Sequence, residues 1–282
     1  MRFGNCISYK DTKRIKILKE TGFDYIETGL APLYTAKNEE IEKFLEDLDE
    51  NKIKCEAVNV LFPGGITLTG ENAEFEKAGG YINEIFEKTK NIGFKYVVFG
   101  SGGARKFPEG FPKEKAIEQI IKTIKEYLIP EAVKYNFTVA IEELNKSETN
   151  IINTVDEAEY IIKIINNPKI KLLADLYHIG IENEDVSKLS KKGEILAHCH
   201  IANPYNKRFY PQKTDDKKAK DLYKIFFESL KAAKYENRIS IEGSPGGLGD
   251  IKNIEIPDWV DEENKQFYAE SKKSLEFMKS HI

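Results

Sequence analysis

Eight short apolar stretches constrain the fold of this sequence more than any other feature. They are rich in β-branched residues and recur along the whole chain, at residues 3–8, 25–28, 53–60, 96–99, 138–141, 170–174, 195–202 and 238–241. The segments between them repeat apolar residues at helical spacing, at residues 13–20, 40–48, 81–90, 116–132, 158–165, 185–192, 222–233 and 264–279. Strands that alternate with helices in this way predict a parallel β-α repeat.

The length of the chain favours one of the two common folds built from such repeats. The chain has 282 residues, roughly 35 for each strand–helix unit, which fits a (β/α)8 TIM barrel. The competing open, doubly wound sheet usually carries a glycine-rich turn directly after its first strand. Here the first strand runs into Tyr9-Lys10-Asp11 without such a turn. We therefore predict one α/β domain, a single (β/α)8 barrel over residues 1–282.

Composition limits the partners and the location. Lys and Arg total 43 and Asp and Glu total 47, so the net charge is −4. Proteins that bind nucleic acids usually carry a positive excess, and we expect no nucleic-acid partner. The sequence contains no apolar run long enough to span a membrane and no signal peptide. Three dispersed cysteines form no disulfide framework, so we predict a cytoplasmic protein. A homo-oligomer is compatible with the sequence.

Metal-binding groups stand at the ends of four late strands. In a TIM barrel these C-terminal ends meet over one cavity. Side chains alternate across a strand, and this parity places Glu142 and Glu242 in the barrel interior and His198 and His200 on one shared face. Asp175 ends an almost wholly apolar strand, where an ionised carboxylate is costly unless it is paired or bound to a metal. The pattern indicates a metal site.

The predicted ligands are Glu142, Asp175, His200 and Glu242. Three carboxylates and one imidazole suit a hard or borderline divalent cation such as Mn²⁺, Mg²⁺ or Co²⁺. Zn²⁺ remains an alternative, although the set contains no thiolate.

Several strand motifs resemble those of a known superfamily. Residues 142–149 read EELNKSET, residues 175–178 read DLYH, residues 198–202 read HCHIA and residues 239–243 read ISIEG. They resemble the motifs of the sugar isomerase/epimerase superfamily of xylose-isomerase-like TIM barrels, which includes D-tagatose/D-psicose 3-epimerase and hydroxypyruvate isomerase. The similarity extends from about residue 3 to residue 279.

The resemblance implies one catalytic divalent metal ion at the four predicted ligands. It also implies that His178 and Glu148 contact oxygens of a small sugar substrate. The family often has an arginine six residues after the metal-binding histidine, but this chain has an asparagine there, and we expect Arg208 to supply the cationic contact. Asn59 and Glu27 stand where family members line the pocket, and a purely structural role is an equal alternative for both.

The chemistry expected of such a site is proton transfer next to a sugar carbonyl. A divalent ion that chelates the carbonyl and the neighbouring hydroxyl stabilises an enediolate. Glu142 and Glu242 would act as the catalytic acid and base. Proton return to the same carbon gives epimerisation, and return to the adjacent carbon gives aldose–ketose isomerisation. We therefore predict a metal-dependent isomerase that acts on a sugar or a sugar phosphate.

Three alternatives use similar residues. An inosose-type dehydratase would use the same metal but expel water. A non-catalytic sugar-binding barrel would not require two inward carboxylates. A nuclease of the AP-endonuclease type gathers three zinc ions, for which four histidines in the whole chain are too few. Phosphorylation of the substrate stays open, because Gly246-Gly247-Leu248-Gly249 follows the last strand, where TIM barrels often bind phosphate.

Overall fold

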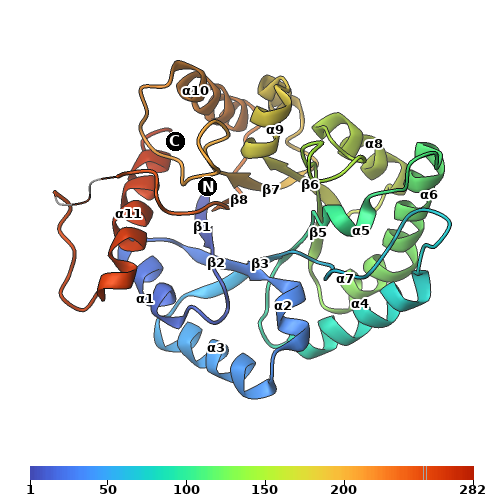
Figure 1. Cartoon of the computed structure of the whole chain (residues 1–282), viewed down its shortest axis with the longest axis horizontal. Coiled ribbons are helices and arrows are strands. Elements are labelled where there is room, and N and C mark those ends of the chain that lie inside the picture. Colours follow the sequence, from blue (N-terminus) through green and yellow to red (C-terminus); the bar gives the residue numbers. More distant parts are fainter. Residues whose placement is uncertain (250, 252) are drawn as a thin grey trace.

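The eight predicted strands close into a parallel barrel (Figure 1). The computed structural model describes residues 1–249, 251 and 253–282. Each strand pairs with the next in the chain, and the last pairs with the first. The strands are β1 (Arg2–Cys6), β2 (Tyr25–Gly29), β3 (Lys54–Asn59), β4 (Tyr96–Phe99), β5 (Thr138–Glu142), β6 (Ile170–Asp175), β7 (Leu196–Ile201) and β8 (Arg238–Ile241). The predicted fold is thus confirmed.

Helices surround the barrel (Figure 1). The longer ones are α1 (Thr12–Thr21), α3 (Asn38–Glu50), α4 (Phe75–Thr89), α6 (Lys113–Thr123), α8 (Val155–Ile165), α10 (Lys217–Ala232) and α11 (Lys265–Lys279). The segment predicted as one helix over residues 116–132 is divided, because a π-helical turn at Ile124–Leu128 separates α6 from α7 (Ile129–Lys134). The weak pattern at residues 185–192 forms a 3₁₀ helix at Val186–Lys191, and a second 3₁₀ turn lies at Glu262–Asn264.

The sequence pattern did not predict three short helices: α2 (Leu30–Thr35), α5 (Gly102–Arg105) and α9 (Leu176–Glu182). Each follows closely on a strand, and each is too short for an apolar repeat to be visible. These helices therefore shape the rim of the barrel where the strands end.

Among the described helices, none has both the length and the apolar character that crossing a bilayer requires.

Strand parity divides the protein into an outer apolar layer and a mostly polar barrel interior. Val139 and Ile141 are buried in the large core between strands and helices, as predicted. The interior contains a small separate apolar cluster of Val98, Ala140 and Leu173. Lower in the barrel, Tyr25 fills the space left by Gly4, where a Cβ atom would lie 2.3 Å from the tyrosine ring. This packed floor leaves the polar residues at the C-terminal strand ends as the accessible part of the interior.

Candidate metal and substrate site

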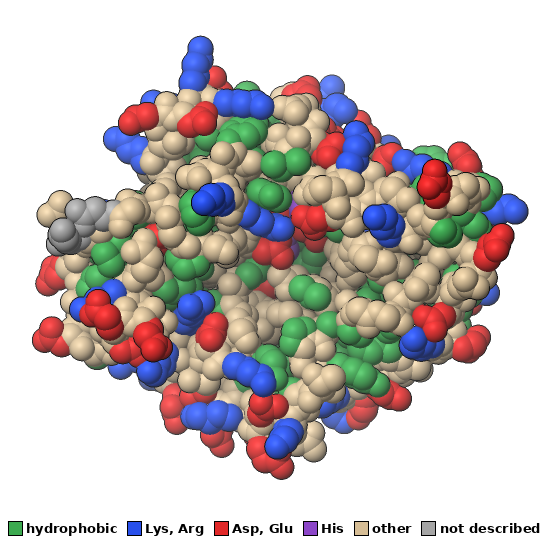
Figure 2. Space-filling model, viewed as in Figure 1, with side chains coloured by type: hydrophobic (Ala, Val, Ile, Leu, Met, Phe, Trp, Pro, Cys, Tyr) green, Lys and Arg blue, Asp and Glu red, His purple; other side chains and the backbone are tan. Residues whose placement is uncertain are grey.

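The four predicted metal ligands converge at the C-terminal end of the barrel. Glu142 ends β5, Asp175 ends β6, His200 lies in β7, and Glu242 directly follows β8. One ligand atom of each lies within 4.8 Å of the others. In Figure 2 acidic and basic side chains gather in a hollow near the middle of this face. Parallel strands bring their last residues to one end, so residues 142 and 242 meet although they are far apart in sequence.

The orientation of His200 is set by a hydrogen bond on its far side. Nε2 lies 2.9 Å from Glu27 Oε1, and because a carboxylate only accepts, Nε2 is the donor. Nδ1 therefore faces the site, 3.3 Å from Glu142 Oε1 and 3.2 Å from Glu242 Oε2. Burial opposes a charge on this ring, but Glu27, Glu242 and Glu142 raise the pKa of His200 well above its usual range. The carboxylates around His200 therefore favour a positive charge at Nδ1, either a proton or a metal ion.

Glu27 connects β7 to the opposite side of the barrel. It is fully buried, and its second oxygen, Oε2, lies 2.8 Å from His198 Nε2 and accepts a hydrogen bond of 2.6 Å from Ser240. Sequence reasoning left open whether Glu27 lines the pocket or has a structural role. Its contacts with both histidines place it behind the ligand cluster, where it orients His200. Carboxylates in this position hold metal-binding histidines in many sites.

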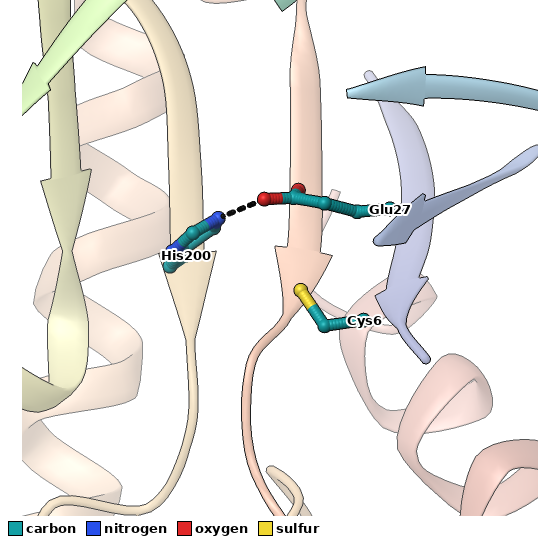
Figure 3. Close-up of side chains that lie close together, drawn as sticks. All are labelled: Cys6, Glu27 and His200. Carbon is teal, nitrogen blue, oxygen red and sulfur yellow. Dashed lines mark hydrogen bonds and ion pairs between the residues drawn. The ribbon is translucent and has the colours of Figure 1, made fainter. Parts of the chain in front are cut away.

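A second set of metal-competent atoms comprises Cys6, Glu27 and His200, which point toward one another inside the barrel (Figure 3). The proton between His200 Nε2 and Glu27 already occupies this space. Burial also raises the pKa of the Cys6 thiol well above its usual range, so the sulfur is a protonated thiol and a poor ligand. We therefore interpret this set as the hydrogen-bonded surroundings of His200 and not as a second metal site.

The carboxylates of the cluster differ in their affinity for protons. Burial raises the pKa of Glu142, and it raises that of Asp175 to about 6. Burial acts on Glu242 in the same direction, but His200 and Arg208 hold its pKa at about 2. Two inward carboxylates of one site are therefore biased toward opposite protonation states.

Arg208 reaches the cluster from the loop after β7. Its guanidinium lies 2.9 Å from Asp175 Oδ2 and also donates to the Glu242 carboxylate, while Nε donates to the Glu242 carbonyl. Glu148, whose side chain is 41% exposed, lies at the outer edge, 3.9 Å from Arg208 Nη1. Asn59 donates to Glu242 Oε1 over 2.9 Å. The predicted substrate-binding residues thus border the predicted metal ligands.

His178 presents an unused donor beside the cluster. The backbone N–H of Asn145 donates to His178 Nδ1 over 3.1 Å, so in the neutral ring the proton is on Nε2. Nε2 lies 3.4 Å from Asp175 Oδ2 but has no hydrogen-bond partner among the described residues. Burial lowers the pKa of His178, which favours this neutral form. The ring can therefore donate to an oxygen of a bound molecule.

The donor set fits a divalent ion. Acceptor atoms from three carboxylates and His200 Nδ1 surround one point, and such an arrangement requires positive charge. Arg208 is the one Lys or Arg side chain that forms ion pairs with these carboxylates among the described residues, so three carboxylates share one permanent positive charge and a further cation is favoured. Oxygen-rich ligand sets of this kind suit Mn²⁺, Mg²⁺ or Co²⁺.

Two further residues, Gly100 and Arg105, support Glu142, a role that the sequence did not predict for them. A Cβ atom on Gly100 would lie 2.0 Å from Glu142 Oε2, so the carboxylate occupies space that only glycine leaves open. Strand register could have revealed this, because Phe99 pairs with Ile141 and the next position faces Glu142. Arg105 is fully buried and donates to the carbonyl oxygens of Phe99 and Glu142 over 2.9 and 2.8 Å. No sequence pattern indicates that contact.

The glycine-rich loop after β8 is already occupied by a carboxylate of the chain. Gly246 donates its N–H to Glu270 Oε1 over 2.6 Å, and Gly247 donates to Oε2 over 3.2 Å. Glu270 comes from α11 and is buried, with Gln266 as a further donor. The backbone amides that could hold a phosphate thus bind an internal anion.

The fold and these strand-end residues define a (β/α)8 barrel with a carboxylate-rich cluster that fits one metal ion. The chain belongs to the Xylose isomerase-like TIM barrel family, which it matches over residues 15–278. The superfamily resemblance found in the sequence is thereby confirmed.

Relatives of known function are sugar epimerases. The 3-dehydro-D-guloside 4-epimerase of Escherichia coli strain K12 is 24% identical over 244 residues, which cover 82% of this chain and 86% of that protein. The D-psicose 3-epimerase of Ruminiclostridium cellulolyticum is 25% identical over 210 residues, 66% of this chain and 64% of that protein. A D-psicose 3-epimerase structure determined in the presence of D-fructose has a TM-score of 0.80, 19% identity and 99% coverage of both chains. It shows the shared fold. Epimerases are isomerases, the enzyme class that the sequence predicts.

Proposed function

We propose that this protein is a metal-dependent ketose epimerase. The observation that carries the proposal is the pair Glu142 and Glu242, which reach the same histidine nitrogen from β5 and from the end of β8. Two carboxylates from different sides of one cavity can remove a proton from one face of a sugar carbon and return it to the other. The names of the curated relatives support this reaction over aldose–ketose isomerisation.

The divalent ion would be held by Glu142, Asp175, His200 and Glu242, and it would stabilise negative charge on the sugar oxygens when bound. Glu142 and Glu242 would form the acid–base pair, in which one carboxylate removes the proton and the other group returns a proton to the opposite face. In the reverse direction the two exchange roles.

Residues around the cluster would orient the substrate. His178 Nε2–H and the Arg208 guanidinium are donors for hydroxyl or carbonyl oxygens of the sugar. Glu148 accepts a hydrogen bond from Asn145 and lies beside Arg208, where it can bind a further hydroxyl. Asn59 would hold Glu242 in place through its amide group.

The proposed substrate is an unphosphorylated sugar. The Glu270 carboxylate already accepts hydrogen bonds from the N–H groups of Gly246 and Gly247. A phosphate at this loop would therefore have to displace a buried carboxylate. Two anions at one set of donors repel each other. The sugar names of the relatives agree with this substrate class.

A deuterium-exchange experiment tests the proposal. The protein is loaded in turn with Mn²⁺, Co²⁺, Mg²⁺ and Zn²⁺ and incubated in D₂O with free ketoses, 3-keto-glycosides and the corresponding phosphates. We expect deuterium at the inverted carbon, together with the epimeric product. The E142Q and E242Q variants should abolish exchange, while a surface variant such as E228Q should not.

Other outcomes identify other functions. Deuterium at carbon 1 or 2 with an aldose product would indicate an isomerase. Loss of water would indicate the dehydratase. Absence of exchange with every sugar, despite bound metal, would refute the enzymatic proposal. Undiminished metal content in both D175N and H200A would refute the proposed ligand set.

A further inference from the structure

A cleft lined by residues of α10 and α11 lies outside the site described above. Gln212 from the loop after β7 and Leu248 from the loop after β8 also line it. Its volume is about 570 Å³, within the range of roughly 300–1,000 Å³ that small-ligand pockets occupy. None of its lining residues belongs to the candidate metal and substrate site.

Positive charge gathers at this cleft although the chain as a whole is acidic. Lys213, Lys220 and Lys273 all line it. Lys273 pairs with Glu276, another lining residue, over 3.0 Å. Within the described part of the chain, neither Lys213 nor Lys220 makes an ion pair. Among the described residues, two ammonium groups of the cleft thus have no ion-pair partner, and they favour an anionic ligand.

The same cleft is lined by a tyrosine whose buried hydroxyl has no partner among the described residues. Tyr223 on α10 is 1% exposed and lines the cleft. Its hydroxyl is buried and has no hydrogen-bond partner among the described residues. An unpaired buried hydroxyl costs about 1–3 kcal/mol, so native proteins rarely keep one without a reason. Burial raises the pKa of this phenol, which remains a neutral donor.

The remaining lining combines polar side chains, those of Gln212, Thr214 and Ser280, with aromatic and apolar surface. Phe277 packs edge-on against Tyr223 with ring centroids 5.0 Å apart, and His281 packs against Phe277 at 4.6 Å. Leu248 adds an aliphatic surface from the loop after β8. Such walls accommodate a flat apolar body better than a hydrated inorganic ion.

We propose that this cleft binds a small organic anion that carries an aromatic ring. Lys213 and Lys220 would neutralise the anionic group, and the Tyr223 hydroxyl would donate to one of its oxygens. The ring would lie against Phe277 and Leu248. The cleft does not depend on the proposed epimerase activity, although residues 212–214 continue the loop that carries Arg208.

Fluorescence titration with anilinonaphthalenesulfonate, an aromatic anion, tests the proposal on the full chain. We expect saturable binding of one probe per chain that phenyl phosphate displaces. Inorganic phosphate and benzyl alcohol, which each lack one half of the ligand, should displace the probe at least about tenfold less well. A free ketose should not displace it.

Variants locate the bound probe. The double variant K213E/K220E should weaken probe binding at least about tenfold, while K224E, on the same helix but outside the cleft, should change it less than about twofold. Y223F should weaken displacement by phenyl phosphate without lowering the melting temperature, because it removes an unpaired hydroxyl. A merely structural tyrosine would leave ligand affinity unchanged.

Three results would overturn the assignment. They are absence of saturable binding, full binding in K213E/K220E, and displacement by a ketose, which would place the probe in the barrel. Equal displacement by inorganic phosphate and phenyl phosphate would refute the aromatic part of the ligand class.

Discussion

Replacing Gly100 with alanine would test whether the position of Glu142 controls the chemistry. The new Cβ atom would lie 2.0 Å from Glu142 Oε2 and 3.2 Å from its carboxyl carbon. The backbone at Gly100 is not in the left-handed region, so alanine itself causes no strain there. The carboxylate must therefore retreat by about 1.4 Å to reach the 3.4 Å of ordinary contact.

The expected effect is large on activity and small on stability. A misplacement of roughly 1 Å at a catalytic group can lower the rate about 100-fold, which corresponds to about 2.7 kcal/mol of transition-state stabilisation. Affinity for the metal should fall as well, because the same carboxylate is a proposed ligand. The free energy of unfolding should change by no more than about 1 kcal/mol, since only one side chain moves.

Three measurements on Gly100→Ala separate these effects: kcat/KM for the best ketose, Mn²⁺ affinity by calorimetry, and the melting temperature. Gly103→Ala is the matched control, because a Cβ atom there meets nothing within 4 Å and the backbone is equally permissive. It should retain full activity. If Gly100→Ala keeps kcat/KM within about threefold of the natural protein, the geometric reasoning is wrong.

Three further predictions concern the support of His200 by Glu27, the effect of pH on metal binding, and backbone strain at Val60. Glu27→Gln should weaken metal binding about 10- to 100-fold, because the amide no longer accepts equally from His200 and His198; wild-type affinity in a competition titration would contradict the assigned role. Burial raises the pKa of Asp175 to about 6, and the surrounding carboxylates raise that of His200 well above its usual range. Protons therefore compete with the metal at both ligands, and calorimetry should show metal affinity falling as the pH is lowered through this range; an affinity independent of pH would contradict the ligand set. Val60 is 47% exposed with φ of +48°, so Val60→Gly should raise the free energy of unfolding in urea by about 1 kcal/mol. The same change at exposed Val133 in helix α7 should lower it by a similar amount; equal effects at both positions would exclude backbone strain.

Local sequence patterns predicted the strands and most of the helices. Alternation of side chains along β5 and β8 also predicted which carboxylates face inward, and the structure places Glu142 and Glu242 beside His200. These features were accessible because side-chain direction in a strand has a period of two, and because parallel strands end on one face. The short helices were missed because one or two turns carry no apolar periodicity.

The sequence by itself determined a barrel of alternating strands and helices and the four residues that meet at its open end. Tertiary structure alone decided what stands behind them. Glu27 contacts His200 across a separation of 173 residues, and Glu270 reaches Gly246 from another element. The Glu142 carboxylate likewise occupies the space that Gly100 leaves empty. Such contacts depend on how closure of the barrel and packing of α11 bring distant segments together, and local periodicity carries no information about those distances.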